Sequence, residues 1–133
     1  MEIQIQTINK IFPEQKPECY SGNKEYKCYW NNNIANIKKL LNKRATQMLY
    51  RLYEGNGRAV YILGISDNGI PDGIIENKIP YNINCIKKMC EIIDATIVSI
   101  RIYNTRKNEN MKIITVRITK DLKSTDSTNE LFY

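Results

Sequence analysis

One segment of the chain, residues 45–73, constrains the fold most, because it joins a helix end, two glycine breaks, an apolar strand and a turn. Gly55 and Gly57 follow a helical pattern and are expected to end it. Residues 58–66 are mainly β-branched or aromatic and almost continuously apolar, which is typical of a central strand. The Asp-Asn-Gly sequence at 67–69 then predicts a turn, since Asn and Gly tolerate positive φ.

The helix before these glycines is predicted to extend through about Tyr53, with Asn31–Asn33 offering N-caps. Apolar residues recur at spacings of three and four and should face the core: Ile34, Ile37, Leu41, Ala45, Met48 and Leu52. A second series, with members four residues apart, should align along another face, flanked by Lys38 and Arg44: Lys39, Lys43, Gln47 and Arg51. Aligned cations repel one another unless an anion lies opposite, so this side is expected to face RNA or solvent.

The second half of the chain predicts a helix followed by a hairpin. Residues 80–95 have a helical apolar pattern, and 96–103 and 111–119 alternate as two strands joined by a polar tip. One alternation class is apolar: Val98, Ile100, Ile102, Ile114, Val116 and Ile118. The other class is mixed: Ser99, Arg101, Tyr103, Ile113, Thr115 and Arg117. We therefore predict an α+β fold, an antiparallel sheet of about four strands with two helices on one face and extended N- and C-terminal arms.

The chain is expected to form one globular domain with two flanking segments. Residues 1–30, interrupted by Pro13 and Pro17, are predicted as an extended N-terminal arm. Their alternating start could add a strand or become ordered only on a partner. The globular α+β domain is predicted over residues 31–120, and 121–133 as a polar C-terminal tail.

The net charge of +6 is unevenly distributed along the chain. Residues 31–58 and residues 95–120 each contain six basic groups and one acidic group. Two basic blocks are expected of a protein that binds a phosphate backbone, although a solvated basic surface would give the same counts. The candidate RNA-binding residues are Lys39, Lys43, Arg44, Gln47, Arg51, Arg58, Arg101, Arg106, Lys107 and Arg117. Asp67, Asn68 and Gly69 form either a plain turn or a loop that contacts a partner.

Catalytic chemistry is poorly represented in the sequence. The chain contains no histidine, which removes the commonest general base and the nucleophile–histidine pairs. It also contains no phosphate-binding loop of the G-x-x-x-x-G-K-[ST] type. Four carboxylates could in principle surround Mg²⁺, although turn and solvent roles explain them more simply: Glu54, Asp67, Asp72 and Glu76. We therefore expect no catalytic residue, no cofactor and no metal.

Cysteine spacing and hydropathy suggest a cytoplasmic protein with reduced thiols. Cys19 and Cys28 are separated by eight residues and Cys85 and Cys90 by four, unlike the close pairs of zinc sites. The second pair falls in the apolar helical pattern and is predicted to be core. Because no apolar run is long enough to cross a bilayer and the N-terminus does not resemble a signal peptide, we expect no membrane partner.

Residues 45–73 resemble the domain that precedes the GTPase in eukaryotic elongation-factor-like GTP-binding proteins. The matching positions are Ala45-Thr46-Gln47-Met48, Arg51-Leu52, Glu54-Gly55, Gly57, Ala59, Tyr61, Gly64, Asp67-Asn68-Gly69 and Gly73. The resemblance continues more loosely through residues 85–98 and covers about residues 40–103. No GTPase follows in this chain, so GTP hydrolysis is not implied.

A small protein of this kind also looks like the microsporidian dormancy factors, which are ribosome-bound hibernation proteins. That resemblance implies occupation of the tRNA exit (E) site, contact with rRNA and nearby ribosomal proteins, competition with tRNA and inhibition of translation by steric occlusion. Three alternatives remain open from the residues alone. They are an adaptor that binds tRNA or other RNA off the ribosome, a metal-dependent ribonuclease and a plain protein–protein module.

Overall fold

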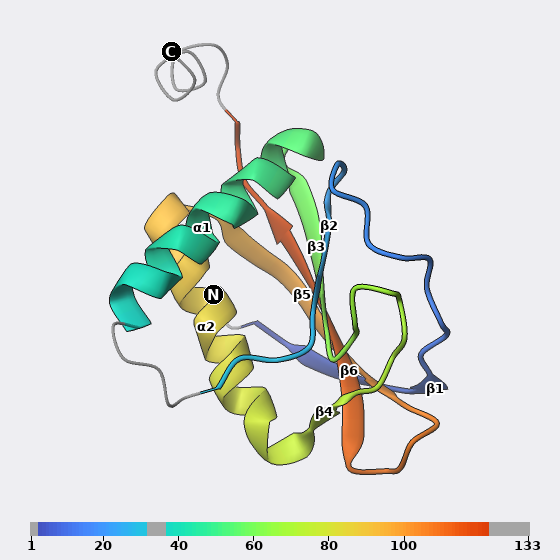
Figure 1. The fold of residues 1–133 in the computed structure, drawn as a ribbon. Helices are drawn as coiled ribbons and strands as arrows, with labels where there is room; N and C mark the ends of the chain where they lie inside the picture. The colour runs from blue at the N-terminus through green and yellow to red at the C-terminus, as the bar shows by residue number, and fades with distance from the viewer. Residues whose placement is uncertain (1–2, 32–36, 123–133) are drawn as a thin grey trace.

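The computed structural model describes residues 3–31 and 37–122, which form one mixed sheet and two helices (Figure 1). In chain order the elements are β1 (Ile5–Ile11), β2 (Lys24–Lys27), α1 (Ile37–Glu54), β3 (Arg58–Leu63), β4 (Ile74–Ile75), a short 3-10 helix (Glu76–Lys78), α2 (Ile79–Ile93), β5 (Thr96–Asn104) and β6 (Met111–Thr119). The predicted N-cap residues Asn32 and Asn33, the stripe residue Ile34 and residues 123–133 of the predicted tail lie outside the described residues.

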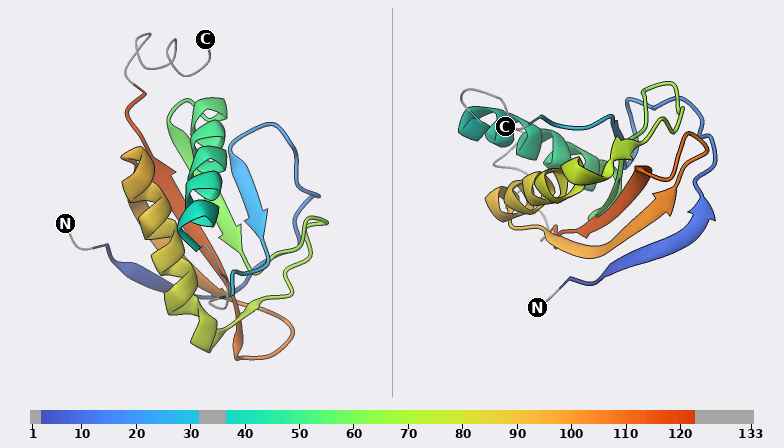
Figure 2. Two further views of the ribbon diagram at one scale, coloured as in Figure 1. Left: turned by 60° about the vertical axis from the view of Figure 1, so that its left-hand side comes forward. Right: turned by 90° about the horizontal axis from the view of Figure 1, so that it is seen from below.

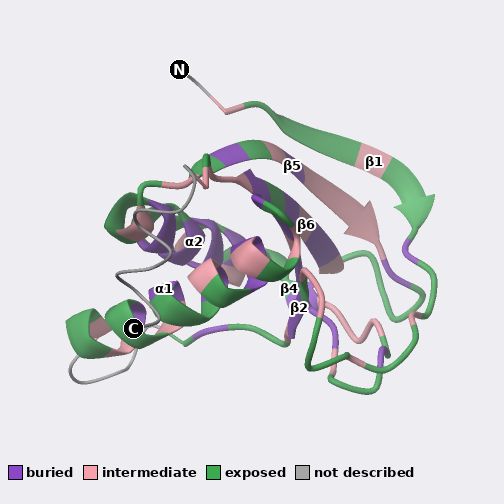
Figure 3. Cartoon of the chain, turned by 90° about the horizontal axis from the view of Figure 1, so that it is seen from above, coloured by how far each residue is buried: buried purple, intermediate pink, exposed green. Residues whose placement is uncertain are grey.

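The six strands form a sheet in the order β1-β5-β6-β3-β2, with the short β4 paired to β6. The β5, β6, β3 and β4 pairings are antiparallel, whereas β1 is parallel to β5 and β2 is parallel to β3. The predicted antiparallel sheet of about four strands is therefore wrong. The N-terminal residues predicted as an extended arm supply both edges of the sheet. The alternating start of the chain adds a strand, one of the two alternatives left open, although β1 is mostly exposed on both faces (Figure 3).

Both helices lie on the same face of the sheet (Figure 2) and enclose the main core with it. Met48 and Leu52 of α1 and Ile86 of α2 are fully buried there against sheet residues such as Tyr61 and Val116. Helix α1 ends at the glycines predicted to stop it. For example, Gly57, at a φ of +95°, donates its N–H to the carbonyl of Leu52 over 2.7 Å. No helix within the described ranges is long and apolar enough to span a membrane.

A smaller apolar cluster lies on the opposite face of the sheet. It consists of Phe12, Tyr26, Ile62, Ile65 and Ile113, with Tyr103 packed against it. The rings of Phe12 and Tyr103 meet edge to face with centroids 5.2 Å apart. The segment that begins at Phe12 therefore covers this end of the face.

Strand β5 contains an irregularity that changes the predicted alternation. Its pairing with β6 shifts between Ile97 and Ser99, so Ile97 is buried and Val98 is 60% exposed. The prediction that Val98 joins Ile100 in the core is wrong for this reason. An extra residue in one strand reverses the side to which preceding residues point, and this bulge turns an apolar side chain outward.

Candidate nucleic-acid interface

The face of the sheet opposite the helices carries a group of cations drawn from four different strands. We call this group the sheet patch, and it consists of Lys24, Arg58, Arg101 and Arg117. Arg117 pairs with Val60 on one side and Ser99 on the other, and Val60 pairs in turn with Lys24. Residues paired across a sheet point to the same face, so this row runs across four strands.

The other two members of the sheet patch flank this row. Arg101 pairs with Thr115, which precedes Arg117 by two residues, and Arg58 precedes Val60 by two residues. Alternate residues of a strand share a face, so all four cations project from one side. Lys24, Arg58 and Arg117 are exposed, and Arg101 is partly buried.

No acidic side chain from the described strands opposes the sheet patch. Glu25 is the one acidic residue in those strands, and it pairs with Tyr61 of the main core, on the helix-covered face. The patch is therefore a surface of one charge, which favours polyanions such as nucleic-acid phosphates.

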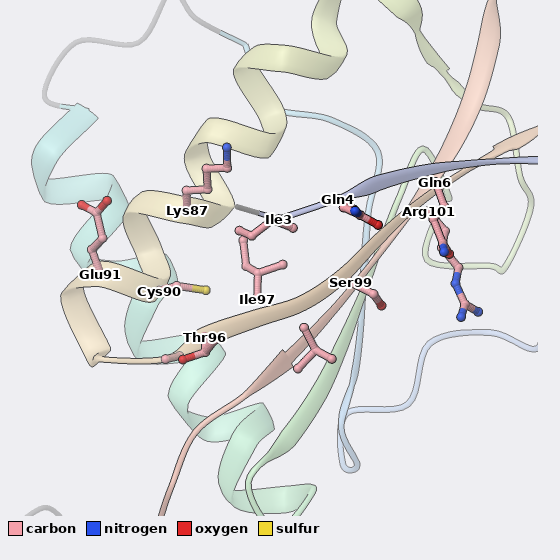
Figure 4. Close-up of a pocket in the computed structure, with 12 residues that line it drawn as sticks. Ile3, Gln4, Gln6, Lys87, Cys90, Glu91, Thr96, Ile97, Ser99 and Arg101 are labelled. Atoms are coloured by element: carbon pink, nitrogen blue, oxygen red, sulfur yellow. The ribbon is translucent and has the colours of Figure 1, made fainter. Parts of the chain in front are cut away.

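Arg101 is the most constrained member of the patch. Its Nε atom is buried and makes no hydrogen bond with any described residue. Arg101 also borders a hollow of about 970 Å³ between β1, the start of β5 and the end of α2 (Figure 4). Lys87, Cys90 and Glu91 of α2 lie on the other side of this hollow. Burial raises the pKa of Cys90 to about 12, so its thiol stays protonated at neutral pH and is a poor nucleophile.

Only part of the predicted basic side of α1 is exposed. Lys39, Lys43 and Gln47 are exposed and point away from the core, and we call these three residues the helix patch. The helix patch and the sheet patch lie on opposite layers of the molecule (Figure 2), so the two predicted basic surfaces do not merge.

Arg51 does not belong to the helix patch, because it does not face solvent as predicted. Its side chain is buried and forms ion pairs with Glu25 at 2.9 Å and with Glu18 at 3.8 Å. Its guanidinium also donates to the carbonyl oxygens of Cys19, Tyr20, Ser21 and Gly22. Through these contacts Arg51 holds residues 18–22, which precede β2, against α1.

Arg44 is likewise directed toward the protein. Its guanidinium carbon lies 5.0 Å from the ring centroid of Trp30, one of its NH groups is buried without a partner among the described residues, and burial lowers its pKa. Trp30 itself is buried. Asn82 holds the Trp30 backbone by accepting from its N–H at 2.7 Å and donating to its carbonyl at 3.1 Å.

Arg106 and Lys107 lie at the exposed tip between β5 and β6. They border a cavity of about 350 Å³ formed with apolar residues that include Phe12 and Ile70. Lys107 pairs with Asp72 at 3.1 Å, and both side chains are more than half exposed, so the pair contributes little to stability.

The predicted turn at 67–69 packs against the N-terminal segment. Gly69 is buried and accepts from the Gln15 N–H at 2.9 Å, and Asp67 accepts from the Glu18 N–H at 2.7 Å, each through its carbonyl oxygen. The side chains of Asp67 and Asn68 remain exposed.

Lys24 of the sheet patch was missed by the sequence prediction because it lies in the segment predicted as an extended arm.

Three of the four carboxylates considered for Mg²⁺ form separate contacts. Glu54 accepts from the Tyr50 hydroxyl and the Gly22 N–H, both at 3.3 Å. Asp72 pairs with Lys107, and Glu76 lies 3.8 Å from Lys112. Across residues 3–31 and 37–122, no three Asp, Glu, Cys or His residues gather closely enough to hold a metal ion.

No known family model and no solved structure matches the chain. Over 90 residues it is 36% identical to GTP-binding protein 2 of Mus musculus and of Homo sapiens, which covers 67% of this chain and 14% of each relative. Over 114 residues it is 30% identical to an uncharacterised protein of Acanthamoeba polyphaga mimivirus, covering 78% of this chain and 61% of the relative. The chain is therefore similar to a segment of GTP-binding protein 2 and spans 14% of that protein's length.

Proposed function

We propose that the protein is a non-catalytic RNA-binding module that acts as a ribosome dormancy factor in the cytoplasm. It would occupy the region of the tRNA exit (E) site and block translation by steric occlusion. The observation that supports RNA binding is the sheet patch, in which four strands contribute Lys24, Arg58, Arg101 and Arg117 to one face without an opposing acid. The ribosome and the E site come from the resemblance of the sequence to dormancy factors.

The side chains around the sheet patch favour structured RNA over unpaired bases. Recognition of single-stranded RNA commonly uses exposed aromatic rings that stack on bases. On this face Tyr26 is buried and Tyr103 packs against Phe12, so neither ring is presented for stacking. The cations are accompanied by Ser99 and Thr115, which can bond phosphate and ribose oxygens. A surface of this kind suits the backbone of folded rRNA.

The proposal assigns no bond-making step to the chain. Three of the four carboxylates considered for a metal-dependent ribonuclease, Glu54, Asp72 and Glu76, are engaged in separate contacts. Burial keeps the Cys90 thiol protonated beside the hollow between β1, β5 and α2. The GTP binding in the name of GTP-binding protein 2 is not extended to this chain, which spans a small part of that protein.

Co-sedimentation with purified ribosomes tests the proposal. The wild-type chain should sediment with ribosomes, and deacylated tRNA filling the exit site should release it. Arg101→Gln/Arg117→Gln should weaken binding by roughly tenfold or more, because two charge-assisted contacts are lost. Lys16→Gln/Lys88→Gln removes the same charge from exposed positions outside both patches and should bind like wild type.

Three outcomes would count against this function. Absence from the ribosome pellet would reject the ribosome as partner. Equal affinity for isolated deacylated tRNA would instead indicate an adaptor that works off the ribosome. Retained binding by Arg101→Gln/Arg117→Gln would reject the sheet patch as the contact surface.

A further inference from the structure

The helix patch is a second cationic surface, and the RNA contact proposed for the sheet patch gives it no role. Lys39 and Lys43 are one turn apart on α1 and both are exposed, with Gln47 one turn further on. Lys38 beside them is exposed as well. Within the described part of α1, Glu54 in the last turn is the one acidic residue, and its carboxylate accepts from Tyr50 and Gly22.

The helix patch and the sheet patch are separated by the whole thickness of the fold. On its inner side α1 buries Met48 and Leu52 in the main core, which lies against the helix-covered face of the sheet. The register of the strands places the sheet patch on the other face of the same sheet, away from that core. A helix alone is about 10 Å across. The two patches are therefore further apart than the Debye length of about 8 Å at physiological salt, and each attracts phosphates independently.

From this arrangement we infer that one copy of the protein binds two RNA segments at once, one on each layer. The inference rests on the proposed RNA binding and adds a second, separate contact surface to it. Charge complementarity identifies RNA phosphates as the occupant of the helix patch, because Lys38, Lys39 and Lys43 are exposed and α1 contains no acidic residue before Glu54. The domain would then lie between two segments of folded RNA and contact one with each layer.

A bridging assay with two short RNA duplexes tests this inference. One 12-base-pair duplex is immobilised and a second carries a fluorophore, and analytical ultracentrifugation confirms that the full chain is monomeric under the same conditions. We expect wild-type protein to capture the fluorescent duplex on the immobilised one. Lys39→Gln/Lys43→Gln and Arg101→Gln/Arg117→Gln should each still bind a single duplex, while bridged capture falls by roughly tenfold. Lys16→Gln/Lys88→Gln serves as the charge-matched control.

The outcomes separate this inference from the proposed function. Binding of one duplex without capture of a second overturns the bridge and leaves RNA binding by the sheet patch in place. Failure to bind any RNA or ribosome overturns both. If Lys39→Gln/Lys43→Gln bridges duplexes normally but sediments poorly with ribosomes, the helix patch contacts an acidic protein and the bridge is again rejected. Far-ultraviolet circular dichroism should show that all these surface variants remain folded.

Discussion

Arg51 of α1 donates from Nε to Oε1 of Glu25 in β2 over 2.9 Å, and both side chains are almost inaccessible to solvent. The remaining guanidinium nitrogens bond backbone carbonyls between Cys19 and Gly22. A buried charge is tolerated when it is paired and its hydrogen-bonding capacity is used, and both conditions hold for Arg51. This pair fixes the parallel edge strand β2 to the helix that covers it.

Replacing Arg51 with alanine should destabilise the fold strongly, because buried Glu25 would lose its shortest ion pair and keep only Lys27, 3.3 Å away. The backbone carbonyls of residues 19–22 would also lose their donor. The expected loss in the free energy of unfolding is about 3–5 kcal/mol. Arg58→Ala, at an exposed position of the sheet patch, should change the same quantity by only about 0.5 kcal/mol. Urea unfolding followed by circular dichroism measures both.

The double variant Arg51→Met/Glu25→Leu is the control for this interpretation. Removing both partners of the 2.9 Å pair removes its two most buried charges, and the charges left behind, Glu18 and Lys27, are partly exposed. Much of the stability lost in Arg51→Ala should therefore return. Full stability of Arg51→Ala combined with weakened ribosome binding would contradict the structural role and restore Arg51 as an RNA contact.

The position of Arg51 explains where helical spacing misled the sequence prediction. Four residues span slightly more than one turn of 3.6, so each step of four rotates the side chain by about 40°. Three steps from Lys39 place Arg51 about 120° around the helix, which brings it beside β2 instead of into solvent. Lys39 and Lys43 stay near the exposed centre. The predicted exposure is therefore correct for Lys39 and Lys43, near the start of the series, and wrong for Arg51, at its end.

The secondary-structure elements also divide into those that were predicted correctly and those that were not. Strand β6 was predicted at its observed bounds, and α1, β3, α2 and β5 were predicted to within a few residues, because each buries a regular apolar pattern. The alternating start of the chain was noticed as a possible strand and forms β1, whereas β2 has only four residues, too few for a detectable periodicity. Pairing partners depend on contacts between distant residues, and the parallel edges could not be inferred from local patterns. Lys24 was missed as a result.

Gly69 should tolerate substitution less well than Gly22, although both have a positive φ, +86° and +92° respectively. A Cβ at Gly69 would lie 2.1 Å from the carbonyl oxygen of Gln15, whereas a Cβ at Gly22 would meet nothing within 4 Å. Gly22→Ala should therefore cost about 1–2 kcal/mol of backbone strain alone. Gly69→Ala should cost about 1–3 kcal/mol more from crowding. Thermal and urea unfolding distinguish the two, and equal losses would show that the turn at 67–69 can separate from Gln15.

The four cysteines should divide into two reactive and two protected thiols. Cys19 and Cys28 are exposed, and Cys85 and Cys90 are buried. The Ser21 hydroxyl, 3.4 Å from the Cys19 sulfur, lowers the Cys19 pKa, while burial raises the pKa values of Cys85 and Cys90. Iodoacetamide at pH 8 followed by mass spectrometry should modify Cys19 first and Cys28 next. Cys85 and Cys90 should react only after denaturation, and their rapid modification in the native protein would contradict the packing of α2.

Stability should fall at alkaline pH because the folded protein holds protons that the unfolded chain releases. The Cys90 thiol has a pKa of about 12 in the fold, against an ordinary value of 9.0. Its stabilising contribution is therefore complete below about pH 9 and is lost progressively as the pH rises toward 12, by at most about 1.4 kcal/mol per pH unit. Cys90→Ala should reduce this slope between pH 9 and 11 in urea unfolding. Because burial also raises the pKa of Tyr61, part of the slope should remain. An identical slope in the variant would show that Cys90 does not contribute.

The salt dependence of RNA binding counts the phosphate contacts made by the sheet patch. Each neutralised phosphate contributes about 0.7–0.9 to the slope of log affinity against log salt concentration, because bound counterions are released. Arg101→Gln/Arg117→Gln should therefore reduce that slope by about 1.4–1.8, measured by fluorescence anisotropy with one RNA duplex across a salt series. Lys16→Gln/Lys88→Gln lowers the net charge equally but should leave the slope unchanged, because Lys16 and Lys88 lie outside the patches. If both double variants lower the slope alike, binding depends on overall charge, and Arg101 and Arg117 make no defined contacts with phosphates.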